Sequence, residues 1–157
     1  MADIEKTGDW EGFGQMLAKA ASQFQAKIKT ATDINGRLLE QKIVQRITSG
    51  QVQPPTGAKF KAWKEKHGYS DTTLMMTTDL MNAIHYENKD WSSGFVGLKR
   101  SAVGKDGKSL ANIGAAMEFG VQGHNIPPRP FITPVIESEG PKISENYQKA
   151  IEEIFTK

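Results

Sequence analysis

A long run of helical periodicity near the start of the chain constrains its fold most. Apolar residues recur at steps of three and four from Trp10 to Ala31, at positions 10, 13, 17, 20, 24, 28 and 31. That spacing places them on one face of an α-helix. The phase continues across Asn35-Gly36, a pair that otherwise favours a turn, through Ile34, Leu38, Ile43 and Ile47. The pattern predicts one long helix, straight or kinked, from an N-cap at Asp9 to a C-cap at Gly50.

Proline and glycine divide the rest of the chain into short elements. Pro54-Pro55 predicts a loop over residues 51–59, because consecutive prolines cannot enter a helix interior. Apolar positions in 80–88 and 92–98, joined by a short link, predict a β-hairpin. A glycine-rich loop over 99–109, a helix over 110–119 and a third strand over 121–126 follow. Thr133-Pro134 starts a C-terminal helix that we expect Gly140-Pro141 to interrupt.

These elements predict an α+β fold. A long N-terminal helix and C-terminal helices are expected to pack on a small, mostly antiparallel β-sheet. With 157 residues, the chain suits a single domain that spans residues 1–157. No apolar run approaches the roughly 18 residues that a membrane span needs, so no membrane partner is expected.

The sequence offers little material for catalysis. It contains no cysteine, and its net charge is only +2. Its three histidines stand far apart and in no metal-binding spacing: His67, His85 and His124. Three helical carboxylates are read as solvated surface charge rather than as an acid–base pair: Glu118, Glu137 and Glu139. We therefore expect no enzymatic activity, no catalytic or metal site and no cofactor.

A basic segment from Lys59 to Lys66 mixes cations with Phe60 and Trp63. Lysines beside aromatic rings can bind nucleic acid through phosphate contacts and base stacking. The alternative is a solvated segment whose two aromatic rings are anchored on the core. The low net charge of the whole chain favours this second interpretation.

The segment Pro127-Pro128-Arg129-Pro130-Phe131 predicts a rigid bend. It is either a proline-rich ligand for a partner or an internal corner that leads into the last helices, and we favour the corner. In that interpretation Phe131 is the buried anchor. Arg129, held on a stiff backbone, directs its planar guanidinium at a carboxylate or a carbonyl.

Three segments, in this order, resemble signatures of the phage virion-morphogenesis, or tail-completion, proteins. Residues 74–84 resemble the family's leucine, threonine-glycine-x-leucine and serine-isoleucine pattern, with Leu80 as the second leucine. Residues 115–120 are similar to its alanine, histidine-glutamate-phenylalanine-glycine element, which here ends in Phe119 and Gly120. Residues 126–132 resemble its isoleucine-proline-alanine-arginine-proline-phenylalanine-leucine element, which here contains Arg129, Pro130 and Phe131.

Trp63 also stands where many members of that family have a tryptophan, so the resemblance covers about half of the chain. Four positions differ from the pattern: Thr78 for glycine, Ala83 for serine, Met117 for histidine and Pro128 for alanine. The resemblance implies a structural protein of a tailed bacteriophage that completes the tail or joins head to tail.

The same resemblance implies where such a protein works and what it contacts. It would form a homo-oligomeric ring, with six as the expected number of subunits, at the neck of the virion. It would assemble in the host cytoplasm and bind a connector, a tail terminator or the tail tube. DNA passing through the ring would be contacted without sequence readout. The alternative function is a small nucleic-acid-binding protein that uses the segment from Lys59 to Lys66.

Overall fold

The computed structural model describes residues 7–155, and its longest element is the expected N-terminal helix. Helix α1 runs from Trp10 to Thr48, 39 residues without a break. The Asp9 carboxylate accepts a hydrogen bond from the Gly12 N–H at 2.8 Å, as an N-cap does. Gly50 follows the end of the helix with a φ of 71°, a conformation that glycine adopts without strain. The single long helix is therefore confirmed.

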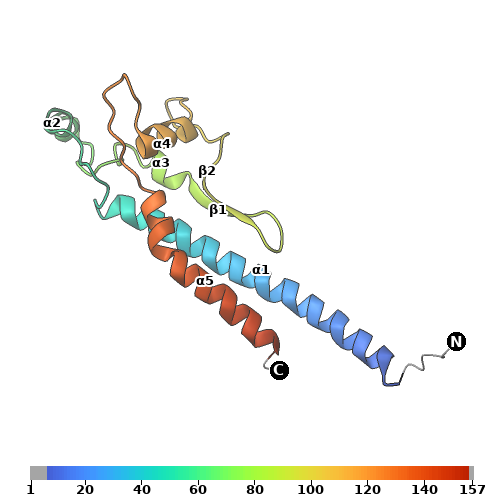
Figure 1. Cartoon of the computed structure of the whole chain (residues 1–157). Helices are drawn as coiled ribbons and strands as arrows, with labels where there is room; N and C mark the ends of the chain where they lie inside the picture. Colours follow the sequence, from blue (N-terminus) through green and yellow to red (C-terminus); the bar gives the residue numbers. More distant parts are fainter. Residues whose placement is uncertain (1–6, 156–157) are drawn as a thin grey trace.

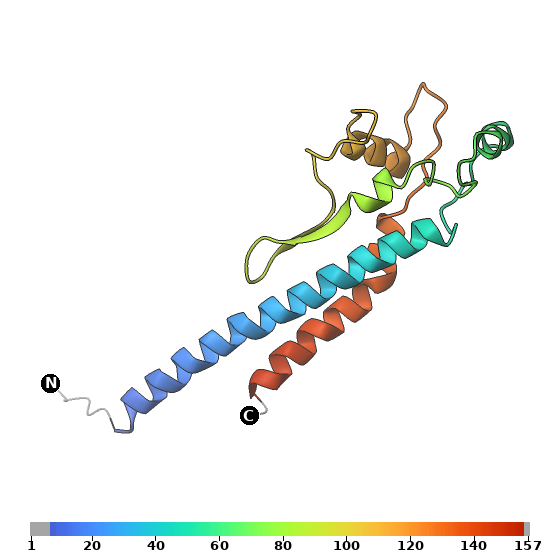
Figure 2. The same cartoon turned by 180° about the vertical axis from the view of Figure 1, so that it is seen from behind.

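A second long helix, α5 (Thr133–Phe155), lies alongside the C-terminal part of α1 (Figures 1 and 2). Polar contacts join the two helices. The Asn146 amide donates to Asn35 Oδ1, and the hydroxyls of Thr32 and Tyr147 lie 3.0 Å apart. The expected interruption at Gly140-Pro141 is wrong, because Pro141 lies inside the continuous α5. Proline has no backbone N–H, so one carbonyl of the preceding turn has no partner within the helix. Pro141 is exposed, and water can hydrogen-bond to that carbonyl.

The expected hairpin is present, and both of its strands begin later than predicted. Strands β1 (Ile84–Asn88) and β2 (Gly94–Leu98) pair antiparallel, with Ile84 opposite Leu98. Residues predicted as the start of β1 instead form the one-turn helix α3 (Asp79–Asn82). The third strand predicted over 121–126 is also wrong: a single bridge between Val121 and Ile126 closes a turn there. The sheet of the described residues thus has two strands.

Gly36 explains how the hairpin sits on α1. A Cβ at this position would lie 2.2 Å from ring atoms of Tyr86, so only glycine admits the ring. The Tyr86 hydroxyl then donates to Asp33 at 2.8 Å, and the Tyr86 N–H donates to Glu40. The Asn35-Gly36 pair is therefore a packing notch within a helix rather than a turn.

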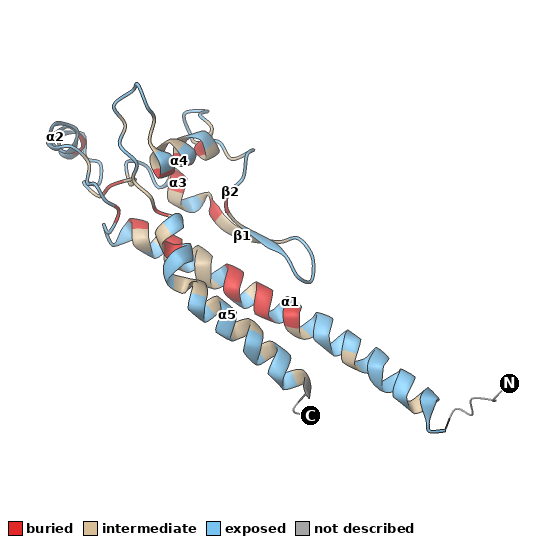
Figure 3. Cartoon of the chain, viewed as in Figure 1, coloured by how far each residue is buried: buried red, intermediate tan, exposed pale blue. Residues whose placement is uncertain are grey.

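Two short helices complete the end of the molecule near the C-terminus of α1. Helix α2 spans Ala58–Lys66, and α4 spans Leu110–Phe119 with Ser109 as its N-cap. The core lies between α1, the hairpin and the start of α5 (Figure 3), and its buried members are Ile43, Ile47, Val52, Ile84, Phe131 and Val135. The α+β fold, with a long N-terminal helix and a C-terminal helix against a small antiparallel sheet, is as predicted. None of the described helices is long and apolar enough to cross a membrane.

Candidate functional site

The carboxylate of Glu118 connects residues 115–120 to residues 126–132, the second and third segments that resemble tail-completion proteins. Glu118 Oε2 accepts hydrogen bonds from the N–H groups of Phe131 and Ile132, at 2.8 and 3.0 Å. Its Oε1 accepts from the Thr133 N–H at 2.8 Å. Thr133 is the first residue of α5, where N–H groups have no partner within the helix, and Phe131 and Ile132 directly precede it. Glu118 therefore caps α5 from the side of α4, and the expectation that it is solvated surface charge is wrong.

The surroundings of Glu118 keep it ionised. Burial raises the pKa of this carboxyl, but the hydrogen bonds from Ile132, Thr133 and Phe131 outweigh burial, so the net pKa lies below the ordinary value of 4.5. A negative charge at a helix N-terminus also interacts favourably with the helix dipole. The corner between α4 and α5 is thus held by the ionised carboxylate of Glu118, which accepts hydrogen bonds from three backbone N–H groups.

Gly120 is the point at which the chain leaves α4. Its φ of 72° and ψ of 173° lie in a region that is essentially restricted to glycine. A Cβ there would meet the Pro128 nitrogen at 2.8 Å and the Ile126 carbonyl oxygen at 2.9 Å. Gly120 therefore lets residues 126–128 return against the end of α4, which brings Glu118 opposite the start of α5.

The proline corner is internal, as favoured from the sequence. Phe131 is completely buried in the core. The Arg129 N–H donates to the Met117 carbonyl, and Arg129 Nε donates to the Pro54 carbonyl at 3.0 Å. The Pro130 carbonyl accepts from Arg46 Nε at 3.4 Å. Arg129 thus contacts a carbonyl within the same subunit and ties the loop before α2 to the corner.

The other three residues singled out from the sequence have different surroundings. Leu80, on α3, is buried, and it lines a cleft of about 580 Å³ between α2, α3, α4 and the loop over residues 99–109. Trp63, on α2, is 42% exposed. Phe119, the last residue of α4, is 75% exposed although it directly follows the buried Glu118. The corner is therefore fixed from inside, while Phe119 faces solvent.

Helix α2 presents a stack of aromatic rings. The Trp63 ring lies 5.5 Å from that of Phe60, 4.3 Å from that of His67 and 5.8 Å from that of Tyr69, centroid to centroid. Phe60 and Trp63 are not anchored on the core as expected from the sequence, because both are more than 40% exposed. The buried residue of α2 is Lys64, whose ammonium donates to the Thr72 carbonyl at 2.8 Å. Burial lowers the pKa of Lys64.

The N-terminal end of α1 carries a surface that the sequence pattern alone did not reveal. The buried residues of α1 begin at Ile28, and Lys27 forms an ion pair with Glu153 near the end of α5. Before that point α1 extends past α5, and its residues are exposed apart from the half-buried Gly12 and Ala20 (Figures 1 and 3). We call residues 10–20 the free end of α1. Its large apolar side chains are 48–59% exposed: Trp10, Phe13, Met16 and Leu17.

The free end is a surface suited to contact another macromolecule, because large apolar residues gathered in one place are uncommon on a monomer. Within the described part of the chain, no group of three or more histidine, cysteine, aspartate or glutamate side chains is placed to hold a metal ion. No family model matches the chain, and neither a curated protein nor a solved structure shows significant similarity to it.

Proposed function

We propose that the chain is a structural virion protein of a tailed bacteriophage. In this proposal it completes the tail or joins head to tail as a homo-oligomeric ring at the neck. The observation that carries the proposal is the free end of α1, which exposes Trp10, Phe13, Met16 and Leu17 on a projecting helix. Such an apolar face is typical of a helix that packs against another chain.

The junction at Glu118 supports the proposal from a second side. The two segments that resemble tail-completion proteins, residues 115–120 and 126–132, are in direct contact through Glu118, Gly120 and the start of α5. Their residues thus share one structural task, the fixed angle between α4 and α5. A protein whose function is to build an assembly, rather than to catalyse a reaction, depends on such fixed angles between its helices.

The proposed partners are other copies of the chain and a connector, tail terminator or tail tube, with passing DNA in the centre. Native mass spectrometry and electron microscopy of the purified chain test the ring directly. We expect a closed homo-oligomer, with six subunits as the first expectation. Antibodies against the chain should label the neck or tail of particles from a lysate of the strain that encodes it. A chain that stays monomeric and is absent from all particles would contradict the proposal.

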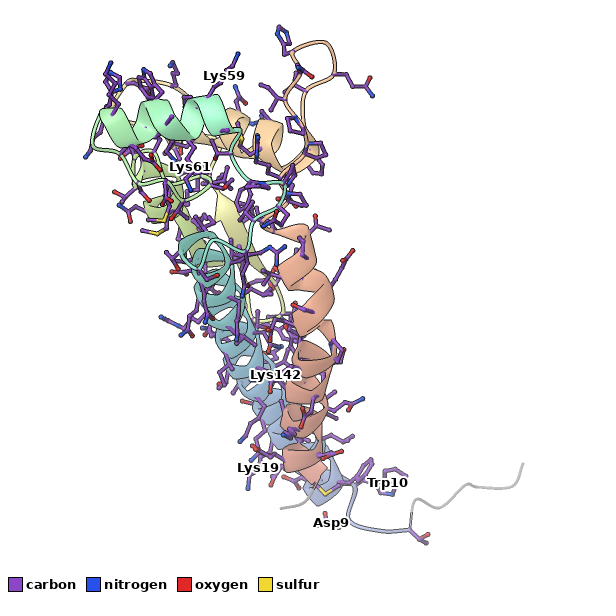
Figure 4. The ribbon with its side chains drawn as sticks, turned by 90° about the vertical axis from the view of Figure 1, so that its left-hand side faces the viewer. Asp9, Trp10, Lys19, Lys59, Lys61 and Lys142 are labelled. Carbon is purple, nitrogen blue, oxygen red and sulfur yellow. The ribbon has the colours of Figure 1, made fainter. Side chains whose placement is uncertain are left out.

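A second candidate, nucleic-acid binding, has one specific observation in its favour. Phe60 and Trp63 stack within 5° of parallel on α2 and remain half-exposed. Lys59 and Lys61 belong to the same helix (Figure 4). Against it, Lys64 is buried and Lys61 forms an ion pair with Asp71. Fluorescence anisotropy with single-stranded and duplex DNA at two salt concentrations tests this candidate. Tight binding by the isolated chain that weakens steeply with salt would favour it over the neck protein.

A further inference from the structure

The cleft beside α3 is mostly apolar, and its lining contains more cations than carboxylates. Its apolar wall is formed by residues of α2, α3, α4 and the segment before α3: Phe60, Leu74, Met76, Leu80, Ile113 and Met117. Four cations line it: Lys64, Lys105, Lys108 and Arg129. Lys105 and Lys108 form ion pairs with Asp79 and Asp106, so Lys64 and Arg129 are the cations in excess of the carboxylates. The cleft therefore suits an apolar ligand that also has negative charge.

The free end of α1 has this combination of properties. Its apolar side chains at positions 10, 13, 16 and 17 follow the spacing of helices that dock into grooves, with anchors three and four residues apart. Asp9 and Glu11 are exposed beside them, and Lys19, two turns further along the helix, is the single cation of residues 9–20. The first turn of the helix is thus apolar and acidic, whereas the cleft is apolar with an excess of cations.

The two surfaces cannot meet within one subunit. A helix of 39 residues is about 58 Å long, and α2 and α4 lie near its C-terminal end (Figures 1 and 2). Figure 4 shows the same separation, with Asp9 and Trp10 at one end of the molecule and Lys59 and Lys61 at the other. Since α1 is continuous, its first turns reach only a cleft that belongs to another chain.

We propose that the free end of α1 of one copy occupies the cleft of the neighbouring copy, in a head-to-tail contact. This inference rests on the proposed function and specifies how its ring is closed. A contact between two different surfaces of the same chain is heterologous, and it produces a ring when the rotation between neighbours closes. Each subunit then gives one helix end and receives one.

The simplest alternative is that the free ends of two α1 helices pair with each other. The charges of the two surfaces favour binding of the free end in the cleft over this pairing. Parallel pairing of two free ends would place Asp9 and Glu11 of one chain beside the same carboxylates of the other. Like charges in close proximity oppose association, whereas the excess of cations at the cleft favours it. The second copy's cleft is therefore the better complement.

The absence of cysteine from the natural sequence makes a direct test possible. Phe13→Cys and Met76→Cys introduce one thiol in the free end and one in the cleft, both at exposed positions. A short bismaleimide linker is then added to the full-length double variant. We expect a ladder of linked chains, and we expect linked dimers when the two single variants are mixed. The matched control combines Phe13→Cys with Ile136→Cys, an exposed apolar position on α5 outside the cleft, and should give no ladder.

Association is measured in parallel by native mass spectrometry. Trp10→Ala should weaken it at least about 30-fold, as expected for a buried aromatic anchor. Ile34→Ala, at an equally exposed apolar position in the middle of α1, should leave it unchanged. Circular dichroism should show both variants folded, since neither side chain is buried in the monomer.

The outcomes separate the docking from the proposed function. Self-linking of the Phe13→Cys variant alone, as efficient as in the mixture, would overturn the docking in favour of paired α1 helices. A ring that forms without any linkage between positions 13 and 76 would overturn the docking and leave the proposed function standing. A wild-type chain without any oligomer would overturn the ring on which the docking rests.

Discussion

The cap that Glu118 places on α5 can be measured as a loss of stability. Glu118→Ala removes three acceptor contacts, to the N–H groups of Phe131, Ile132 and Thr133. The N–H of Phe131 is buried, and a buried donor without a partner costs about 1–3 kcal/mol. The other two donors are partly accessible, and their loss resembles the loss of an N-cap, about 1 kcal/mol. We expect a total of about 3 kcal/mol, a large share of the stability of a small domain.

A graded series separates hydrogen bonding from charge. Glu118→Gln keeps one oxygen in the place of Oε2, but its amide NH₂ then faces the Thr133 N–H. We expect it to cost about 1–2 kcal/mol, less than alanine, because one of the three contacts and the charge are lost. Glu137→Ala, at an exposed position on α5, is the control and should change stability by no more than about 0.5 kcal/mol. Urea denaturation followed by circular dichroism provides the free energies of unfolding.

The pH dependence of this series has a definite sign. The pKa of Glu118 is lowered in the folded chain, so its stabilising contribution is complete at pH values above the unfolded value of 4.5. It is lost as the pH falls through the folded pKa, below 4.5. The difference between wild type and Glu118→Ala should therefore be full at pH 7 and shrink in strong acid. A Glu118→Ala variant as stable as the Glu137→Ala control at pH 7 would refute the capping role.

Four further variants test the corner and its exposed end. Phe131→Ala should cost about 3–5 kcal/mol, because a fully buried ring is removed, and a melting curve measures it. Gly120→Ala should cost more than about 2 kcal/mol from its φ of 72° and its clash with Pro128, again by melting. Arg129→Lys should cost up to about 1 kcal/mol, since lysine does not replace the Nε contact to Pro54. Phe119→Ser should change stability by less than about 0.5 kcal/mol and reduce oligomer formation in native mass spectrometry.

Local periodicity predicted the helices well and their burial less well. The apolar face of α1 was evident from Trp10 to Ile47, but periodicity does not say which part of a face is covered. Helix lengths do: α5 has 23 residues, about 35 Å, and cannot cover the roughly 58 Å of α1. The length of α1 is visible in the sequence, but that of α5 is not, because Gly140-Pro141 predicts a break that the structure does not have.

Two local signals failed because tertiary contacts outweigh them. Asn35-Gly36 favours a turn in isolation, yet here the glycine admits the Tyr86 ring and the helix continues. Gly140-Pro141 favours a break, yet packing along α1 keeps α5 continuous through Pro141. Neither partner is adjacent in sequence, so composition near these pairs contains no sign of it.

The spacing of Glu118 in α4 indicates a buried position, although its charge alone favours a position on the surface. Leu110, Gly114 and Glu118 lie four residues apart, on the same face of α4, and all three are buried. A carboxylate on a buried face requires donors, and the N–H groups at the start of a following helix are available ones. The pattern thus indicates a capped helix, which surface-charge reasoning about single residues does not reveal.

Two consecutive residues at the end of α4 face opposite ways, one into the core and one into solvent, and the exposed residue is available to the proposed assembly. Glu118 points inward and is fixed by three N–H donors, while Phe119 points outward and is 75% exposed. Gly120 then turns the chain so that the corner closes behind both residues. Because the inward contacts hold the backbone, the backbone at Phe119 loses little further conformational freedom when a partner covers its ring. An exposed aromatic ring on a fixed backbone is thus a second position, apart from the free end of α1, that a neighbour in the proposed assembly would cover.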